Sequence, residues 1–133
     1  MTPFSPDIEY AERGQGQPLL FLPGSFGTGA GWKLVIGRLG EGYRFITTSL
    51  LGYGATSERR PAGNTTMAHV LDSLLERIEE PAHLVAHSFG GLSAIAHALY
   101  GRRKAISLIL VEPNPFGILR QRAIPSTTAC SAP

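Results

Sequence analysis

The stretch HLVAHSFGGLS (residues 83–93) joins a short apolar run to a run of small residues through one serine, Ser88. The apolar run before Ser88 has the length and composition of a buried strand. The segment from about Phe89 to Tyr100 follows the serine directly and has the pattern of a helix. A serine between a strand and a helix lies where a tight turn pushes its hydroxyl outward. The stretch therefore predicts an exposed hydroxyl, which needs a base to become a nucleophile.

The residues two positions before and after Ser88 must be small for such a turn to form. The chain has Ala86 and Gly90 there, which gives A-x-S-x-G where the usual pattern is G-x-S-x-G. A string of this kind is common by chance, but it is far more specific between an apolar strand and a small-residue helix. The spacing predicts that Ser88 occupies a sharp strand-to-helix turn with an unusual backbone conformation.

The rest of the chain alternates between strand and helix patterns. Continuous apolarity in PLLFLPG (residues 18–24) predicts a strand covered on both faces. Apolar residues at helical spacing predict a helix from Met67 to Ile78. The other predicted elements are strands over 8–13, 43–48 and 105–111, a helix over 31–39, and an N-cap for the 67–78 helix at Asn64, Thr65 or Thr66. This alternation predicts an α/β fold with a mainly parallel sheet flanked by helices.

The composition limits the class of protein. With 133 residues, 43% of them hydrophobic and 17% charged, the chain is expected to form one globular domain. The densest basic run, residues 102–104, has no interleaved aromatic residues, which argues against nucleic-acid binding. No run approaches the roughly 20 apolar residues of a membrane helix, and the first ten residues lack the apolar core of a secretory signal. With Cys130 as its only cysteine, the chain is predicted to be cytoplasmic, with no membrane partner.

Three stretches carry a family resemblance: LLFLPGSFGTG (19–29), SLLGYGATS (49–57) and VAHSFGG (85–91). Together they resemble the α/β-hydrolase family, and the resemblance covers about residues 8–116. It implies that residues 1–116 form the N-terminal part of an α/β-hydrolase domain, with a truncated version of that fold. The chain departs from the family pattern at Ser49, where an aspartate is frequent, and at Pro23, where a histidine often precedes Gly24.

The resemblance also implies a role for the residues around the serine. Ser88 would attack a small ester-like substrate, and the backbone N–H groups of Ser25 and Phe89 would form the oxyanion hole. Loss of one such donor typically removes ~3 kcal/mol of transition-state stabilisation. The residues that would support the turn are Gly24, Ala86 and Gly90.

The Gly-rich loop over residues 24–31 has two other interpretations. It is either a flexible turn without function or a loop that binds phosphate. The second interpretation fails, because the loop lacks the Gly-Lys-Ser/Thr of a Walker motif and has Trp32 where a dinucleotide fingerprint needs glycine. We therefore predict no cofactor and no metal, and a small-molecule substrate.

The partners of the serine are harder to find. Glu112 closes the strand 105–111 and is a possible triad acid, with a solvated glutamate as the equal alternative. Asp72, on the polar side of its helix, and Asp7 are interpreted as surface charges. None of the histidines, His69, His83, His87 and His97, is a credible base. Only His97 follows Ser88, and it lies roughly 13 Å along the next helix.

The expected base is therefore missing, because the family order places the histidine after the acid. We expect a complete relative to continue with further strands, and residues 117–133 to form a disordered tail. The strand 105–111 would then be a sheet edge that leaves Ile106, Leu108 and Leu110 or their neighbours exposed and promotes self-association. Two functions stay open: a serine hydrolase present as its N-terminal half, or a non-catalytic binding protein that retains the fold.

Overall fold

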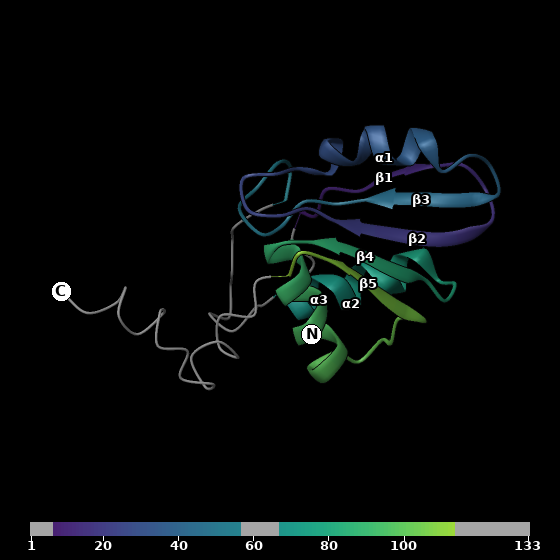
Figure 1. Cartoon of the computed structure of the whole chain (residues 1–133). Helices are drawn as coiled ribbons and strands as arrows, with labels where there is room; N and C mark the ends of the chain where they lie inside the picture. The colour runs from purple at the N-terminus through teal and green to yellow at the C-terminus, as the bar shows by residue number, and fades with distance from the viewer. Residues whose placement is uncertain (1–6, 57–66, 114–133) are drawn as a thin grey trace.

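The computed structural model describes residues 7–56 and 67–113, which form a five-stranded sheet in the order β1-β3-β2-β4-β5 (Figure 1). The strands are β1 (Ala11–Arg13), β2 (Gln17–Leu22), β3 (Tyr43–Thr47), β4 (His83–His87) and β5 (Ser107–Val111). Only the β1–β3 pair is antiparallel among these neighbours; the β2–β3, β2–β4 and β4–β5 pairs are parallel. The predicted α/β fold with a mainly parallel sheet is confirmed.

Helices cover the two faces of the sheet (Figure 1). On one face, α2 (Met67–Ile78) and α3 (Phe89–Tyr100) enclose an apolar core to which the central strand β2 contributes Leu20. On the other face, the 3-10 helix η1 (Gly29–Trp32) and α1 (Lys33–Arg38) pack near Phe21 of the same strand. Leu20 and Phe21 are at most 1% exposed. The prediction that this strand is covered on both faces is therefore confirmed.

Several element boundaries differ from the sequence prediction, three of them by two residues or more. Residues 8–10 lie outside β1, and the Glu9 N–H donates to the Thr56 hydroxyl instead of to a neighbouring strand. The helix predicted over 31–39 begins as η1, because the Gly31 N–H bonds to the carbonyl three residues earlier. The last strand begins at Ser107. The N-cap candidates of α2 and the predicted tail over 117–133 lie outside the described residues.

The prediction that Asp72 is a surface charge is wrong. Its side chain is 2% exposed, and its Oδ1 lies 3.1 Å from Nε2 of His97. The backbone N–H groups of Arg102 and Arg103 donate to the same carboxylate at 3.1 and 2.8 Å. These four residues, the Asp72 cluster, join α2 to the C-terminal end of α3. The helical pattern of α2 could not reveal partners that lie 25 to 31 residues further along the chain.

Strand β5 lies at one edge of the sheet, as predicted. Leu108 and Leu110 are partly buried against the α2–α3 core, so the exposed residues of this strand are their neighbours, as the prediction allowed. Side chains alternate between the faces of a strand, and the neighbours Ile109 and Val111 are 50% and 42% exposed instead. Ile106, just before the strand, is 51% exposed as expected. Exposed apolar residues therefore do gather at this edge, but within the strand they are the odd-numbered residues instead of Leu108 and Leu110.

Candidate active site

Ser88 lies between the last residue of β4 and the first residue of α3. Its backbone has φ 51° and ψ −119°, a combination that L-residues rarely adopt. The Ser88 N–H donates to the Val111 carbonyl at 3.0 Å, and the Ser88 carbonyl accepts the Gly91 N–H at 2.9 Å. The predicted strand-to-helix turn with an unusual backbone conformation is confirmed.

Gly90 explains how α3 can begin so close to the end of β2. A Cβ at this position would overlap the carbonyl oxygen of Pro23 and lie 3.0 Å from that of Leu22. Both neighbours are backbone atoms, so no side chain could rotate out of the way. Ala86 on the other side of Ser88 is fully buried, and its methyl group is accommodated. The two positions thus tolerate side chains of different size: position 86 accommodates a methyl group, and position 90 has no space for a Cβ.

The loop that follows β2 lies against the Ser88 turn. A Cβ on Gly24 would lie 3.1 Å from the Cβ of Ser88 and 3.2 Å from Nδ1 of His87. Residues 24–27 form a tight turn, which the Gly27 N–H closes by donating to the Gly24 carbonyl at 3.1 Å. Ser25 is the next residue after Gly24 and is exposed. The close approach of Gly24 therefore brings the Ser25 backbone near Ser88.

Glu9 holds this loop from the N-terminal segment, which the sequence did not suggest. Its carboxylate accepts the N–H groups of Gly29 and Ala55, each at 3.2 Å, and the hydroxyl of Ser49 at 2.5 Å. Hydrogen bonds to a charged acceptor are stronger than neutral ones. The bonds join the loop after β2 to the loop after β3, and Ser49 is the position where the family often has an aspartate. The partners lie 20 to 46 residues from Glu9, so no local pattern signals them.

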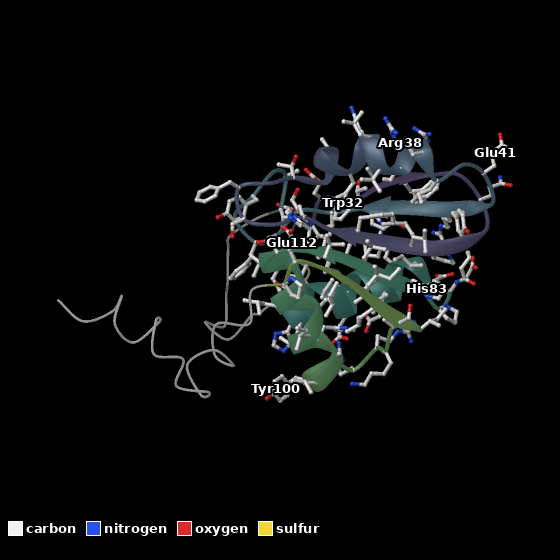
Figure 2. The ribbon with its side chains drawn as sticks, in the orientation of Figure 1. Trp32, Arg38, Glu41, His83, Tyr100 and Glu112 are labelled. Carbon is white, nitrogen blue, oxygen red and sulfur yellow. The ribbon has the colours of Figure 1, made fainter. Side chains whose placement is uncertain are left out.

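Glu112 follows β5 at the end of the sheet where α3 begins (Figure 2). Its side chain is exposed and its backbone has φ 47°. Because the preceding Val111 carbonyl accepts the Ser88 N–H, the backbone of Glu112 adjoins the Ser88 turn. The structure thus brings the candidate acid and the candidate nucleophile to one place, and a role for Glu112 in catalysis stays a prediction.

The four histidines of the chain occupy different environments. His83 begins β4 and lies at the opposite end of the sheet from Glu112 (Figure 2). His97 is fully buried within the Asp72 cluster. His69 is exposed on α2, and the ring of His87 lies against the loop that follows β2.

The described residues contain neither a metal cluster nor a membrane-spanning helix. Within residues 7–56 and 67–113, no three side chains of His, Cys, Asp or Glu are grouped so that they could hold a metal ion. Nor does the described part of the chain contain a helix with the length and apolarity needed to cross a membrane.

Comparison with known proteins shows to which family this chain belongs. The model of the alpha/beta hydrolase family matches residues 19–132. The chain belongs to the α/β-hydrolase family. This α/β hydrolase is 32% identical over 111 residues to the pimeloyl-[acyl-carrier protein] methyl ester esterase of Vibrio vulnificus, a match that covers 84% of the chain and 42% of the esterase. The family resemblance seen in the three sequence stretches is confirmed.

Solved structures agree with the fold of this α/β hydrolase. An esterase from Exiguobacterium antarcticum matches with a TM-score of 0.70 and 29% identity, over 80% of the chain and 41% of the esterase. A bromoperoxidase from Bacillus anthracis matches with a TM-score of 0.71 and 28% identity, over 81% of the chain and 41% of that protein. The chain thus spans about two fifths of the length of these relatives.

Proposed function

We propose that this chain carries the nucleophile of a serine hydrolase that acts on a small ester-like substrate. The Ser88 Oγ attacks the ester carbonyl carbon, and its proton passes to a general base. The base then gives this proton to the departing alcohol, and water hydrolyses the acyl-enzyme that remains. The observation that carries the proposal is the positive φ of Ser88, in a turn between β4 and α3 that lies against Gly24. The fold places this turn at the carboxyl ends of parallel strands, where open α/β sheets bind their ligands.

Two backbone groups are proposed to hold the oxyanion. The N–H of Phe89 belongs to the first turn of α3, whose first N–H groups have no partner within the helix and carry its positive dipole end. The N–H of Ser25 follows Gly24, which lies against Ser88. Gly24, Ala86 and Gly90 support the arrangement by keeping the loop, the strand and the helix close together.

The proposed acid is Glu112, and the proposed base is a histidine from outside these 133 residues. The family order of nucleophile, acid and histidine puts the base after Glu112, and the last histidine of this sequence is His97. The burial of His97 and the distant position of His83 favour a second candidate function, a binding protein that retains the fold without its chemistry. The activity and substrate of the whole protein are proposals in either case.

A cytoplasmic location is proposed because Cys130 is the only cysteine of the chain, so that the fold needs no internal disulfide. Self-association is proposed through the β5 edge, where Ile106 and Ile109 are about half exposed. An unpaired strand edge with apolar neighbours favours pairing with another chain.

Covalent labelling with a small fluorophosphonate tests whether Ser88 is a reactive nucleophile. We expect slow labelling of one site, located at Ser88 by peptide mass spectrometry, and no labelling of Ser88→Ala. The matched control is Ser73→Ala on α2, which should be labelled at the rate of the original chain. Absence of labelling at Ser88 in the unsubstituted chain would overturn the hydrolase proposal and favour the binding protein.

Hydrolysis of an activated aryl ester tests the proposal about the base. We expect a feeble rate without an inflexion near pH 6.5, the ordinary pKa range of histidine. Replacing His69, His83, His87 or His97 singly by Gln should change the rate by less than about twofold, since a base must reach the proton that it removes. The rates are measured from pH 5 to 9. A rate that disappears in one variant, His87→Gln above all, would identify a base within this chain.

A further inference from the structure

Phe26 has a backbone conformation that its residue type disfavours. Its φ is 64°, in the left-handed region where a bulky side chain raises the free energy of the folded state. Phe26 is the third residue of the 24–27 turn, and a third residue with positive φ is usually glycine or asparagine. Its side chain is also 90% exposed, so burial does not compensate for the strain. Neither the local conformation nor the described core explains a phenylalanine here.

The Phe26 ring does have one aromatic neighbour, Tyr53. The two ring centroids are 6.0 Å apart and the planes are nearly perpendicular at 87°, a favourable edge-to-face arrangement. Tyr53 belongs to the loop after β3, and its N–H donates to the Leu50 carbonyl at 2.9 Å. The pair therefore joins two loops that follow neighbouring parallel strands and that Glu9 also connects.

Phe26 lies two residues after Gly24, which contacts the Ser88 turn. The 24–27 turn begins at Gly24, where a Cβ would be 3.1 Å from the Cβ of Ser88. Two residues of chain span at most about 7 Å, so the Phe26 Cα lies within that distance of the Gly24 Cα. The candidate oxyanion donor, the Ser25 N–H, is on the residue between them. A substrate whose carbonyl oxygen meets this N–H would therefore be bound one residue away from Phe26.

We propose that Phe26 and Tyr53 form an apolar wall of the substrate site and bind an aryl or alkyl group of the ester. This inference rests on the proposed role of Ser88 as nucleophile. Strained residues cluster at active sites and ligand clamps, and an exposed aromatic ring offers a large apolar contact to a ligand. The preferred substrate is then an ester with an apolar acyl or alcohol group, and Phe26 determines that preference.

Phe26→Gly separates a role in recognition from a role in packing. Glycine is the residue that the turn conformation favours, so the variant should have an equal or higher melting temperature. Two fluorophosphonate probes, one with a methyl group and one with a phenylalkyl group, are compared by their rates of Ser88 labelling. We expect the ratio of the phenylalkyl rate to the methyl rate to fall about tenfold in Phe26→Gly and to be largely restored in Phe26→Trp.

The control is Leu34→Ala, which removes an 82% exposed apolar side chain from α1 and should leave the ratio unchanged. An unchanged ratio in Phe26→Gly would overturn the inference while the nucleophile proposal stands, whether or not the melting temperature of the variant falls. Labelling of Ser88 by neither probe in the original chain would overturn both proposals.

Discussion

Asp72→Ala should lower the free energy of unfolding by about 1–3 kcal/mol, because it removes a buried acceptor that three polar groups share. The carboxylate accepts the N–H groups of Arg102 and Arg103 and lies 3.1 Å from the His97 ring, which is fully buried. Without it, the His97 ring loses its partner in a place that water does not reach, and two part-buried N–H groups lose their acceptor. Urea unfolding followed by circular dichroism measures the change.

Glu76→Ala is the matched control for this loss of a charge. Glu76 lies on the same helix and its carboxylate is 3.4 Å from the Arg102 guanidinium, but both side chains are more than half exposed. Exposed ion pairs contribute about 0–1 kcal/mol, so this variant should unfold close to the original chain. Equal effects of the two substitutions would contradict a structural role for the Asp72 cluster.

The same cluster should make stability depend on acid pH. Burial disfavours the charged Asp72 carboxylate, but the N–H groups of Arg103 and Arg102 and the His97 ring outweigh it and hold its pKa below the ordinary value. A pKa that is lower in the folded state stabilises the fold above the unfolded pKa of about 3.9, and this stabilisation is lost as the pH falls. The stability difference between the original chain and Asp72→Asn should therefore shrink below about pH 4. A difference that stays constant from pH 7 to pH 3 would contradict this.

Gly90→Ala should lower the rate of Ser88 labelling by about 10²-fold, since displacements near 1 Å at a reactive site have effects of that order. The added Cβ would overlap the Pro23 carbonyl and lie 3.0 Å from that of Leu22. The loop after β2 would have to move away from α3 and take the Ser25 N–H with it. Forced overpacking of this kind also destabilises a fold by about 1–3 kcal/mol. Labelling kinetics and urea unfolding measure the two effects separately.

Gly37→Ala is the control for adding a methyl group to a helix. A Cβ at this position in α1 would meet nothing within 4 Å. Alanine in place of a helical glycine stabilises by roughly 0.5–1 kcal/mol, so this variant should keep its labelling rate and be slightly more stable than the original chain. Labelling of Gly90→Ala at the original rate would show that the contact between α3 and the loop is not needed for reactivity.

The sequence by itself determined the regular elements and the Ser88 turn. Met67–Ile78 and Phe89–Tyr100 are helices within the predicted bounds, because a helix that covers a sheet must repeat its apolar residues at helical spacing. The strand before Ser88 and the small residues at 86 and 90 leave a short-range pattern in the same way. Such features depend on neighbours within a few positions, so they can be recognised in a single chain.

Only the tertiary structure decided which polar and aromatic groups act together. The partners of Asp72, Glu9 and Phe26 lie about 20 to 46 residues away along the chain. Asp72 in particular has the spacing of a polar helix position, yet it is buried where α2 meets the end of α3. Contacts between distant segments have no period in the sequence, because they arise from how the finished layers pack against one another.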